Sequence, residues 1–515
     1  MKRYTYSFVC IFTFLIACNR FSGKEQNSGE LPEIFPDYTE ITIPPNIAPL
    51  NFRINEEGKK YLVIIAPDKG GRQIEINSGN GIIRFPQKTW KRLLGENKGA
   101  GFNVIVKVEN QNKSVTVFNP FHVNISTDSI NKYIAYRLIP PGYYSWSRIR
   151  IMQRCLENFS ENTVVDNAIL DKNCVNCHSF AKNNPDRFMV HVRGSHGGTY
   201  FMNNGKLERT DPKTAGMPGS ATYPSWHPGG RYIAYSSNQV RQSFYAESSK
   251  SIEVFDLSAS IVLFDTKDNK IIPVSEEDTT NYLRTFPGWS PDGKYLYYCR
   301  AVNSIPPDNP ELDKIMSIHH DLVRKSFDET TETFGKTEVI YEASKMGKSV
   351  SFPRISPDGK FLVFTLHDFG TFPIWHAEAD LYSLNLMNGE VTKLDLNSNE
   401  AESYHSWSSD GRWIVFSSKR SDGRSTRPHF SHIDSEGKAT KPFMLPQKDP
   451  DFYGNLIESY NIPEFITGKI SAGPRDFLEA TTQTAVKSKT GNDPDNNSRV
   501  VTTGSKTSTS TSAHQ

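Results

Sequence analysis

Alternating hydrophobic and polar positions run through most of the chain, and they predict short strands rather than helices. Between residues 36 and 146 the alternating runs are broken by Gly, Asn and Pro; examples are NFRI, KYLVIIA, RQIEI, FNVIVKV and FHVNI. Runs of this length with turn residues between them are typical of antiparallel strands. We therefore expect a β-sandwich-like N-terminal domain over residues 36–146.

One longer pattern recurs four times after residue 220. The copies read YPSWHPGGRYIAYSS, FPGWSPDGKYLYYCR, FPRISPDGKFLVFTL and YHSWSSDGRWIVFSS. Each joins a short strand led by an aromatic residue to a longer alternating strand, through a turn that contains glycine. The turn glycines can adopt left-handed backbone, and the aspartates before them can bond back to the turn; these aspartates are Asp292, Asp358 and Asp410.

The four copies resemble the SPDG-type blades of the TolB-like family, also called PD40 or WD40-like repeats. The resemblance implies a mostly β chain with a TolB-like β-propeller over residues 220–470, in a family where six blades is the common count. The hairpin expected near residues 188–210 and material near either end would supply the remaining blades. Such propellers also precede a hydrolase domain in prolyl oligopeptidase-like peptidases, but the chain has no GxSxG nucleophile elbow. We expect no enzyme of that class.

The N-terminus has the pattern of an export signal. Basic Lys2 and Arg3 precede an apolar run that ends in LIAC at Cys18, and this run is too short to span a bilayer. It resembles a lipoprotein lipobox, the alternative being an ordinary signal peptide. The resemblance implies a signal peptide over 1–18, lipidation of Cys18, a tether over 19–35, and a protein anchored to a cell-envelope membrane, in our expectation the outer membrane.

The segment NCVNCHSF contains two thiols and a histidine, Cys174, Cys177 and His178. Two thiols at this spacing can add to one haem, and the histidine that follows can ligate its iron. The motif resembles the attachment site of c-type cytochromes and implies one covalent haem c, in a short helical insert from about 147 to 182 within a segment 147–219. A disulfide, a surface redox pair and half of a zinc site are the alternatives, although a zinc ribbon would need a second CxxC.

A second axial ligand would be a methionine or a histidine. The candidates that follow the motif are Met189, His191, His196, Met202 and Met217. Two further cysteines, Cys155 and Cys299, either pair or remain buried thiols.

The composition of the chain argues against nucleic acid as a partner. The chain is 37% hydrophobic and 23% charged with a net charge of +2, which gives no electrostatic footprint for nucleic acid. Residues 480–515 are poor in apolar residues and predict a disordered tail. The leading hypothesis is an envelope haem protein that transfers electrons to a redox partner or senses redox state or a ligand. The alternatives are a haem-independent scaffold that binds envelope proteins and a haem enzyme such as a peroxidase.

Overall fold

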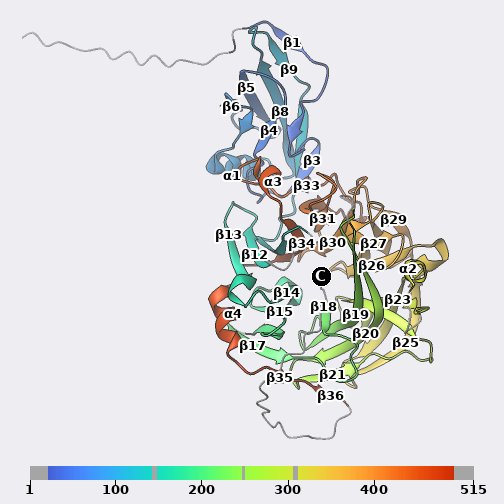
Figure 1. Cartoon of the computed structure of the whole chain (residues 1–515). Coiled ribbons are helices and arrows are strands. Elements are labelled where there is room, and N and C mark those ends of the chain that lie inside the picture. Colours follow the sequence, from blue (N-terminus) through green and yellow to red (C-terminus); the bar gives the residue numbers. More distant parts are fainter. Residues whose placement is uncertain are drawn as a thin grey trace, which may run out of the picture.

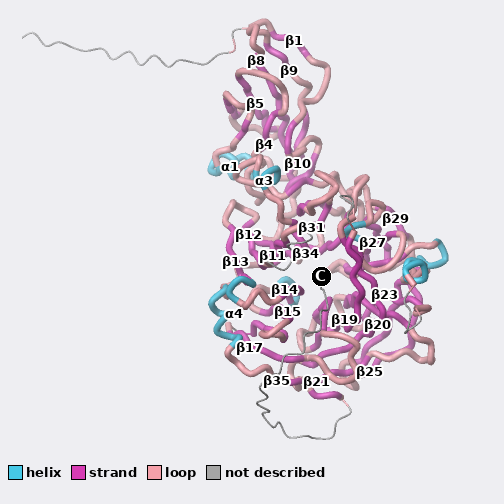
Figure 2. The backbone as a smooth tube through the Cα atoms, viewed as in Figure 1, coloured by secondary structure: helices cyan, strands magenta, loops and turns pink. Residues whose placement is uncertain are grey.

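The structure is a computed structural model that describes residues 21, 23–141, 148–203, 205–245, 250–305 and 311–491. The predicted signal peptide, Cys18 and the tail from residue 492 lie outside the described residues. The prediction of a mostly β protein is confirmed, because strands predominate and the described residues contain four α-helices, three of them with eight or fewer residues (Figure 2).

The N-terminal domain contains two sheets and a helix. The larger sheet joins β1 (Glu25–Asn27), β3 (Ile41–Ile43), β5 (Lys60–Pro67), β6 (Ile74–Ser78), β8 (Ala100–Glu109), β9 (Val115–Val117) and β10 (Phe121–Ile125). The smaller one joins β2 (Ile34–Phe35), β4 (Phe52–Ile54) and β7 (Ile82–Ile83). Helix α1 (Gln87–Glu96) was not expected; it buries Trp90, Leu93 and Leu94. Part of the predicted tether is β1, which pairs in parallel with β9.

Six further sheets follow along the chain, each built around four antiparallel strands, with a parallel fifth on two of them. The first contains β11 (Tyr133–Ile139), β12 (Arg150–Cys155), β13 (Glu161–Asp166) and β34 (Ser459–Ile466). The second contains β14 (Cys174–Phe180), β15 (Arg187–Arg193), β16 (Gly198–Asn203), β17 (Lys206–Asp211) and β35 (Val486–Lys487). The third contains β18 (Ala221–Trp226), β19 (Tyr232–Phe244), β20 (Ile252–Asp265), β21 (Lys270–Pro273) and β36 (Lys489–Thr490).

The last three sheets each have four strands. The fourth contains β22 (Tyr282–Trp289), β23 (Tyr295–Val302), β24 (Asp321–Asp328) and β25 (Thr333–Tyr341). The fifth contains β26 (Ser349–Ile355), β27 (Phe361–His367), β28 (Asp380–Asn385) and β29 (Val391–Lys393). The sixth contains β30 (Glu402–Trp407), β31 (Trp413–Ser418), β32 (Arg427–His432) and β33 (Phe443–Met444).

The six sheets form a β-propeller. One strand of each contacts its counterparts in the two neighbouring sheets, which gives a closed ring in the order β34, β14, β18, β22, β26, β30; Figure 1 shows the sheets around a common centre. We call these six the inner strands. The ring is closed by β34, which comes from the end of the described chain and pairs with β11. Residues after Leu445 therefore complete the ring, in agreement with the expectation that material near the ends of the chain contributes to the blades.

The repeated SPDG turns form as expected. In each, the aspartate side chain accepts a hydrogen bond from the backbone N–H two residues later, at Asp292, Asp358 and Asp410. Glycines follow with φ of 76°, 74° and 70°, a conformation that residues with a Cβ rarely adopt.

The expected helical insert is wrong. Residues 150–155 and 161–166 are β12 and β13, and the motif itself is strand β14. The segment RIRIMQRC lies within the expected helical insert, but its alternation makes it a strand that pairs with β11. Strand β11 lies within residues 36–146, which were expected to form the N-terminal domain. It belongs instead to the first sheet of the propeller.

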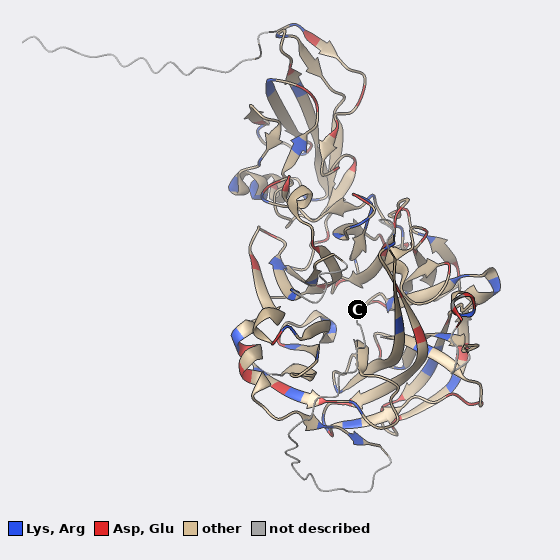
Figure 3. Ribbon diagram, in the orientation of Figure 1, with Lys and Arg blue, Asp and Glu red and all other residues tan. Residues whose placement is uncertain are grey.

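The N-terminal domain rests on the first and sixth sheets (Figure 1). One hydrophobic core spans both, from Ile41 and Phe121 to Trp413 and Phe443. The indole N–H of Trp413 donates to the backbone oxygen of Asp128, 3.1 Å away. Lysine and arginine are interspersed with aspartate and glutamate over both parts (Figure 3).

The start of the predicted tail is ordered. Helix α4 (Pro474–Thr481) buries Phe477, and β35 and β36 then add in parallel to β17 and β21. The remaining helices are α2 (Leu312–Met316) and α3 (Phe452–Asn455). In the described part of the chain no helix combines the length and the apolar character needed to cross a bilayer.

Candidate functional site

Four aromatic side chains meet at the centre of the propeller. Tyr223, Phe286, Phe352 and Tyr404 occupy the same position in four consecutive inner strands, each at a break in strand register. Their ring centroids lie 4.6, 4.1 and 4.9 Å apart in that order. All four have positive φ, between 46° and 54°, which is strained backbone for bulky residues. We call these four residues the aromatic plug.

The haem-type motif occupies the equivalent position in the second sheet. In β14 the register breaks between Val175 and His178, so Asn176 and Cys177 stand where Tyr223 and Pro224 stand in β18. In the first sheet the position belongs to Ile462 of β34. The motif segment is therefore a further copy of the inner strand, and the aromatic plug is incomplete beside it.

A cavity of about 760 Å³ lies on one side of the aromatic plug. Its wall includes Asn176, Cys177, Tyr223 and Tyr404, and residues far apart in sequence complete it: Arg137, Ile374, Trp375, Lys419, Tyr453 and Asn461. We call it the axial cavity. Residues that follow the breaks line a smaller pocket of about 200 Å³, among them Trp226, Arg354 and Glu464. Burial raises the pKa of Glu464 to about 8.

The three motif side chains have different surroundings. Cys177 lines the axial cavity, whereas Cys174 belongs to the hydrophobic core of the first two sheets, together with Val175 and Phe180. His178 is buried and is not part of the cavity wall. Neither of its ring nitrogens has a hydrogen bond of normal geometry within the described part of the chain, although the backbone of Ile462 lies close enough to favour the charged form. Burial, helped by the charge of Arg137, lowers the pKa of His178 to about 3, so its imidazole is neutral at pH 7.

The five candidates for a second ligand do not reach the axial cavity. Met189 and Met217 are buried in one core between the second and third sheets, and Met202 lies in the core shared with Cys174. His191 is buried with Nδ1 3.0 Å from Oγ1 of Thr199. His196 lies with Nε2 2.8 Å from a carboxylate oxygen of Asp171.

Cys155 and Cys299 are both buried free thiols. They lie in β12 and β23, in different sheets. The disulfide that the sequence left open does not form.

Two buried cations line the axial cavity. Arg137 donates to the backbone oxygen of Asn176 and to Oδ1 of Asn461, each at 3.0 Å, and both acceptors are neutral. Lys419 is 2% exposed and its amine has no hydrogen-bond partner among the described residues. The amine lies 2.8 Å from the centre of the Trp375 ring. Burial lowers the pKa of Lys419 well below its usual value, against the opposing effects of Glu400 and Asp422.

A histidine cluster lies next to this wall but outside it. His376 follows Trp375 and lies with Nε2 2.8 Å from Glu253 and Nδ1 3.1 Å from Glu378. The ring of His367 meets that of His376 edge-on with centroids 5.4 Å apart. Because carboxylates already occupy both nitrogens of His376, the cluster is a hydrogen-bonded network. Among the described residues the group with metal-ligand spacing is Asp265, Asp268 and Glu332, and Arg231 pairs with all three.

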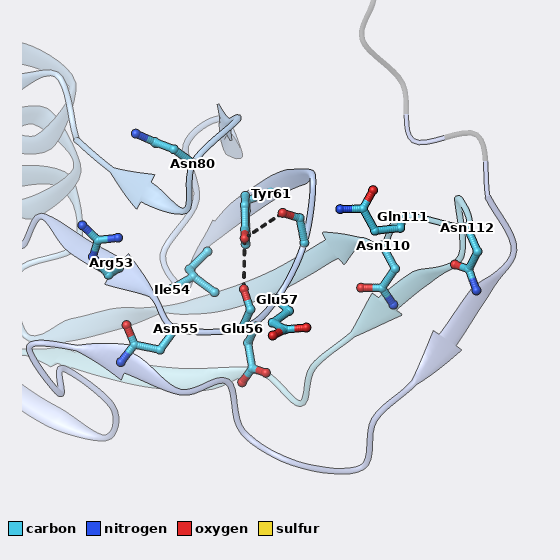
Figure 4. A pocket seen from close by; sticks show the side chains of 11 residues that line it. Arg53, Ile54, Asn55, Glu56, Glu57, Tyr61, Asn80, Asn110, Gln111 and Asn112 are labelled. Carbon is cyan, nitrogen blue, oxygen red and sulfur yellow. Dashed lines mark hydrogen bonds between the residues drawn. The ribbon is translucent and has the colours of Figure 1, made fainter.

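A larger hollow of about 1,090 Å³ lies on the N-terminal domain (Figure 4). Its side chains are mostly exposed amides and carboxylates, such as Asn55, Glu57 and Asn112. The buried Tyr61 donates to backbone oxygens of Glu56 and Gly58 and is satisfied locally. The hollow lacks converging buried polar groups, so the axial cavity is the better candidate site.

The sequence interpretation missed Arg137, Lys419 and the aromatic plug. A signal existed for the plug, because each of the four repeats begins with its aromatic residue. None existed for Arg137 and Lys419, which come from the first and sixth sheets and meet only when the ring closes.

Comparison with known proteins gives distant similarity. No family model matches the chain. A dipeptidyl-peptidase 5 from Porphyromonas endodontalis is 25% identical over 228 residues, which cover 40% of this chain and 30% of that protein. The chain thus matches less than a third of the length of this relative.

Solved structures match the chain at low similarity. The Dos1 propeller aligns over 53% of this chain and 63% of its own, with 13% identity and a TM-score of 0.29. The oligogalacturonate lyase of Vibrio parahaemolyticus aligns over 59% of this chain and 92% of its own, with 9% identity and a TM-score of 0.31.

Proposed function

We propose that this protein is a lipid-anchored, extracytoplasmic propeller of the TolB-like kind that carries one covalent haem and uses it for electron transfer or for redox or ligand sensing. Cys174 and Cys177 would hold the haem, and His178 would be the proximal iron ligand. The anchor would be Cys18. The haem would supply one-electron chemistry or a site for a small ligand.

The observation that carries the proposal is the state of His178. A buried imidazole without a hydrogen bond of normal geometry is costly, because its desolvated nitrogens lose their contacts with water. A metal ion would satisfy one nitrogen, and the neutral form that burial favours is the form that ligates iron. The adjacent Cys177 opens onto a cavity of a size suited to a cofactor.

The proposal requires a change in β14. Cys174 lies in the core of the first two sheets and Cys177 lines the axial cavity, so the two thiols do not face one space in this structure. Attachment through both would shift the strand at Asn176 and Cys177, where the register is already broken. That break is where β14 can move at least cost to its pairing with β15.

The test is covalent haem in protein made in a host that matures c-type cytochromes. We expect a haem-stained band that survives denaturation, its loss in the Cys174→Ser, Cys177→Ser double variant, and its retention in Cys299→Ala, which alters a buried thiol elsewhere. His178→Ala should keep the haem and change its reduced and oxidised absorption spectra. Absence of haem from the unaltered protein would contradict the proposal and favour the haem-independent scaffold.

A further inference from the structure

The two buried cations of the axial cavity form no ion pair within the described part of the chain. Within the described residues, neither Arg137 nor Lys419 has a carboxylate oxygen within 4.0 Å. Among the other buried cations, Lys325 pairs with Glu277, whereas Arg154 and Arg427 donate, as Arg137 does, to neutral oxygens. Lys419 differs from all of them, because its amine has no hydrogen-bond partner among the described residues.

Such an arrangement is expensive unless something compensates it. A buried ion without a partner loses its hydration free energy, and no contact within the protein compensates for that loss. The one acidic side chain in the cavity wall, Asp422, is exposed and accepts hydrogen bonds from the backbone N–H groups of Arg424 and Ser425. Arg424 adds a third positive charge to the wall. Among the described residues, the cavity wall therefore carries three positive side chains and one negative one.

The remaining wall is largely apolar and aromatic. Trp375, Tyr223 and Tyr404 present ring faces or edges, and Phe372, Ile374 and Leu456 add aliphatic and aromatic surface. Rings favour stacking with flat groups. The wall therefore combines a surface for a flat apolar body with two desolvated cations for an acid group.

We propose that the axial cavity binds an anionic molecule with a flat apolar body, whose carboxylate or comparable acid group is held by Lys419 and Arg137. The inference stands without the haem. If the haem of the proposed function lies in this cavity, the acid groups are its own; otherwise they belong to a free organic acid. Charged hydrogen bonds of this kind account for about tenfold or more in affinity each.

The test uses full-length protein made without c-type maturation and two fluorescent probes of similar shape. Anilinonaphthalene sulfonate carries the negative charge, and phenylnaphthylamine lacks it. We expect stoichiometric binding of the anionic probe, with quenching of tryptophan fluorescence that Trp375→Phe removes. Lys419→Met should weaken the anionic probe about tenfold or more and leave the neutral probe unchanged. Lys438→Met, at a side chain that is 74% exposed, is the matched control.

The outcomes separate the two proposals. Equal affinity for the anionic probe in the unaltered protein and in Lys419→Met overturns the inference. Because Arg137 also bridges β14 and β34, Lys419→Met is the deciding variant and Arg137→Met the supporting one. If haem-loaded protein no longer binds the probe, the haem is the source of the acid group. If haem-loaded and haem-free protein bind it equally, with the same loss in Lys419→Met, the acid is a free ligand and the haem does not lie in this cavity.

Discussion

Phe286 and Phe352 pack against each other at the centre of the propeller, with ring centroids 4.1 Å apart. They come from neighbouring inner strands, and each has a φ of 54°. Tyr223 packs edge-on against both rings. Four inner strands thus have strained backbone at the residues of the aromatic plug. The rings of these residues lie between the axial cavity and the smaller pocket.

Removal of one ring should destabilise the propeller. Phe352→Ala deletes a side chain that is 5% exposed and leaves a cavity where several sheets meet, so we expect a loss of about 3 to 5 kcal/mol in the free energy of unfolding. Urea denaturation measures it. Met387→Ala, at a side chain that is 81% exposed, should change the value by less than about 0.5 kcal/mol. A similar small loss for Phe352→Ala would show that the rings do not hold the sheets together.

Closure of the ring by β34 should be indispensable. A chain that ends at residue 455 lacks the strand that pairs with β11 and contacts β14 and β30. The first sheet then has an open edge at the centre, and the hydrophobic core shared with the N-terminal domain loses Tyr460 and Phe465. We expect the cooperative thermal transition to disappear in calorimetry. A chain that ends at residue 491 is the control and should melt as the full-length protein does.

The contact between His376 and Glu253 should stabilise the protein more in acid than in base. Burial opposes the charge of His376, but hydrogen bonds with Glu253 and Glu378 raise its pKa above the usual value. The contribution is therefore fully present below the unfolded pKa of about 6.5 and is lost as the pH rises through the raised folded pKa. Glu253→Gln should cost about 3 to 5 kcal/mol near pH 6 and less near pH 9, in urea melts at both values.

The control for that comparison is an exposed pair. Lys345 and Glu342 lie 2.7 Å apart with side chains 70% and 49% exposed. Glu342→Gln should change stability by less than about 1 kcal/mol at either pH. An equal loss at both pH values for Glu253→Gln would show that the charge of His376 does not contribute.

Lys419→Met should stabilise the haem-free protein. The amine is buried without a carboxylate, and its pKa is lowered by that burial, so the unfolded state binds the proton more tightly. Stability of the unaltered protein therefore rises with pH until the unfolded pKa near 10.4 is reached. We expect an advantage of about 1 to 3 kcal/mol for the variant near pH 7 that shrinks towards pH 10. An advantage that stays constant with pH would contradict a charged Lys419 as its origin.

The repeats could be predicted because their signals are local. The alternation of apolar and polar residues predicts the strands, and the Ser-Pro-Asp-Gly pattern predicts the turn between them. In that turn the Asp292 carboxylate accepts a hydrogen bond from the N–H of Lys294, a contact that depends only on neighbouring residues. The same logic failed for residues 147–182. There the chemistry of the cysteine motif points to the helical surroundings of a c-type site, whereas VNCHSF and FMVHV alternate and pair as strands β14 and β15.

The sequence alone determined that this chain is built from strands, that four of its segments are copies of one unit, and that Cys174, Cys177 and His178 are the residues with haem-type spacing. Strand pairing in three dimensions makes the motif an inner strand, closes the ring with β34, and brings Arg137 and Lys419 to one cavity. Period and turn chemistry act over a few residues and can be recognised along the chain. The convergence of residues 137, 177 and 419 depends on strand pairing across hundreds of residues, which no local pattern encodes.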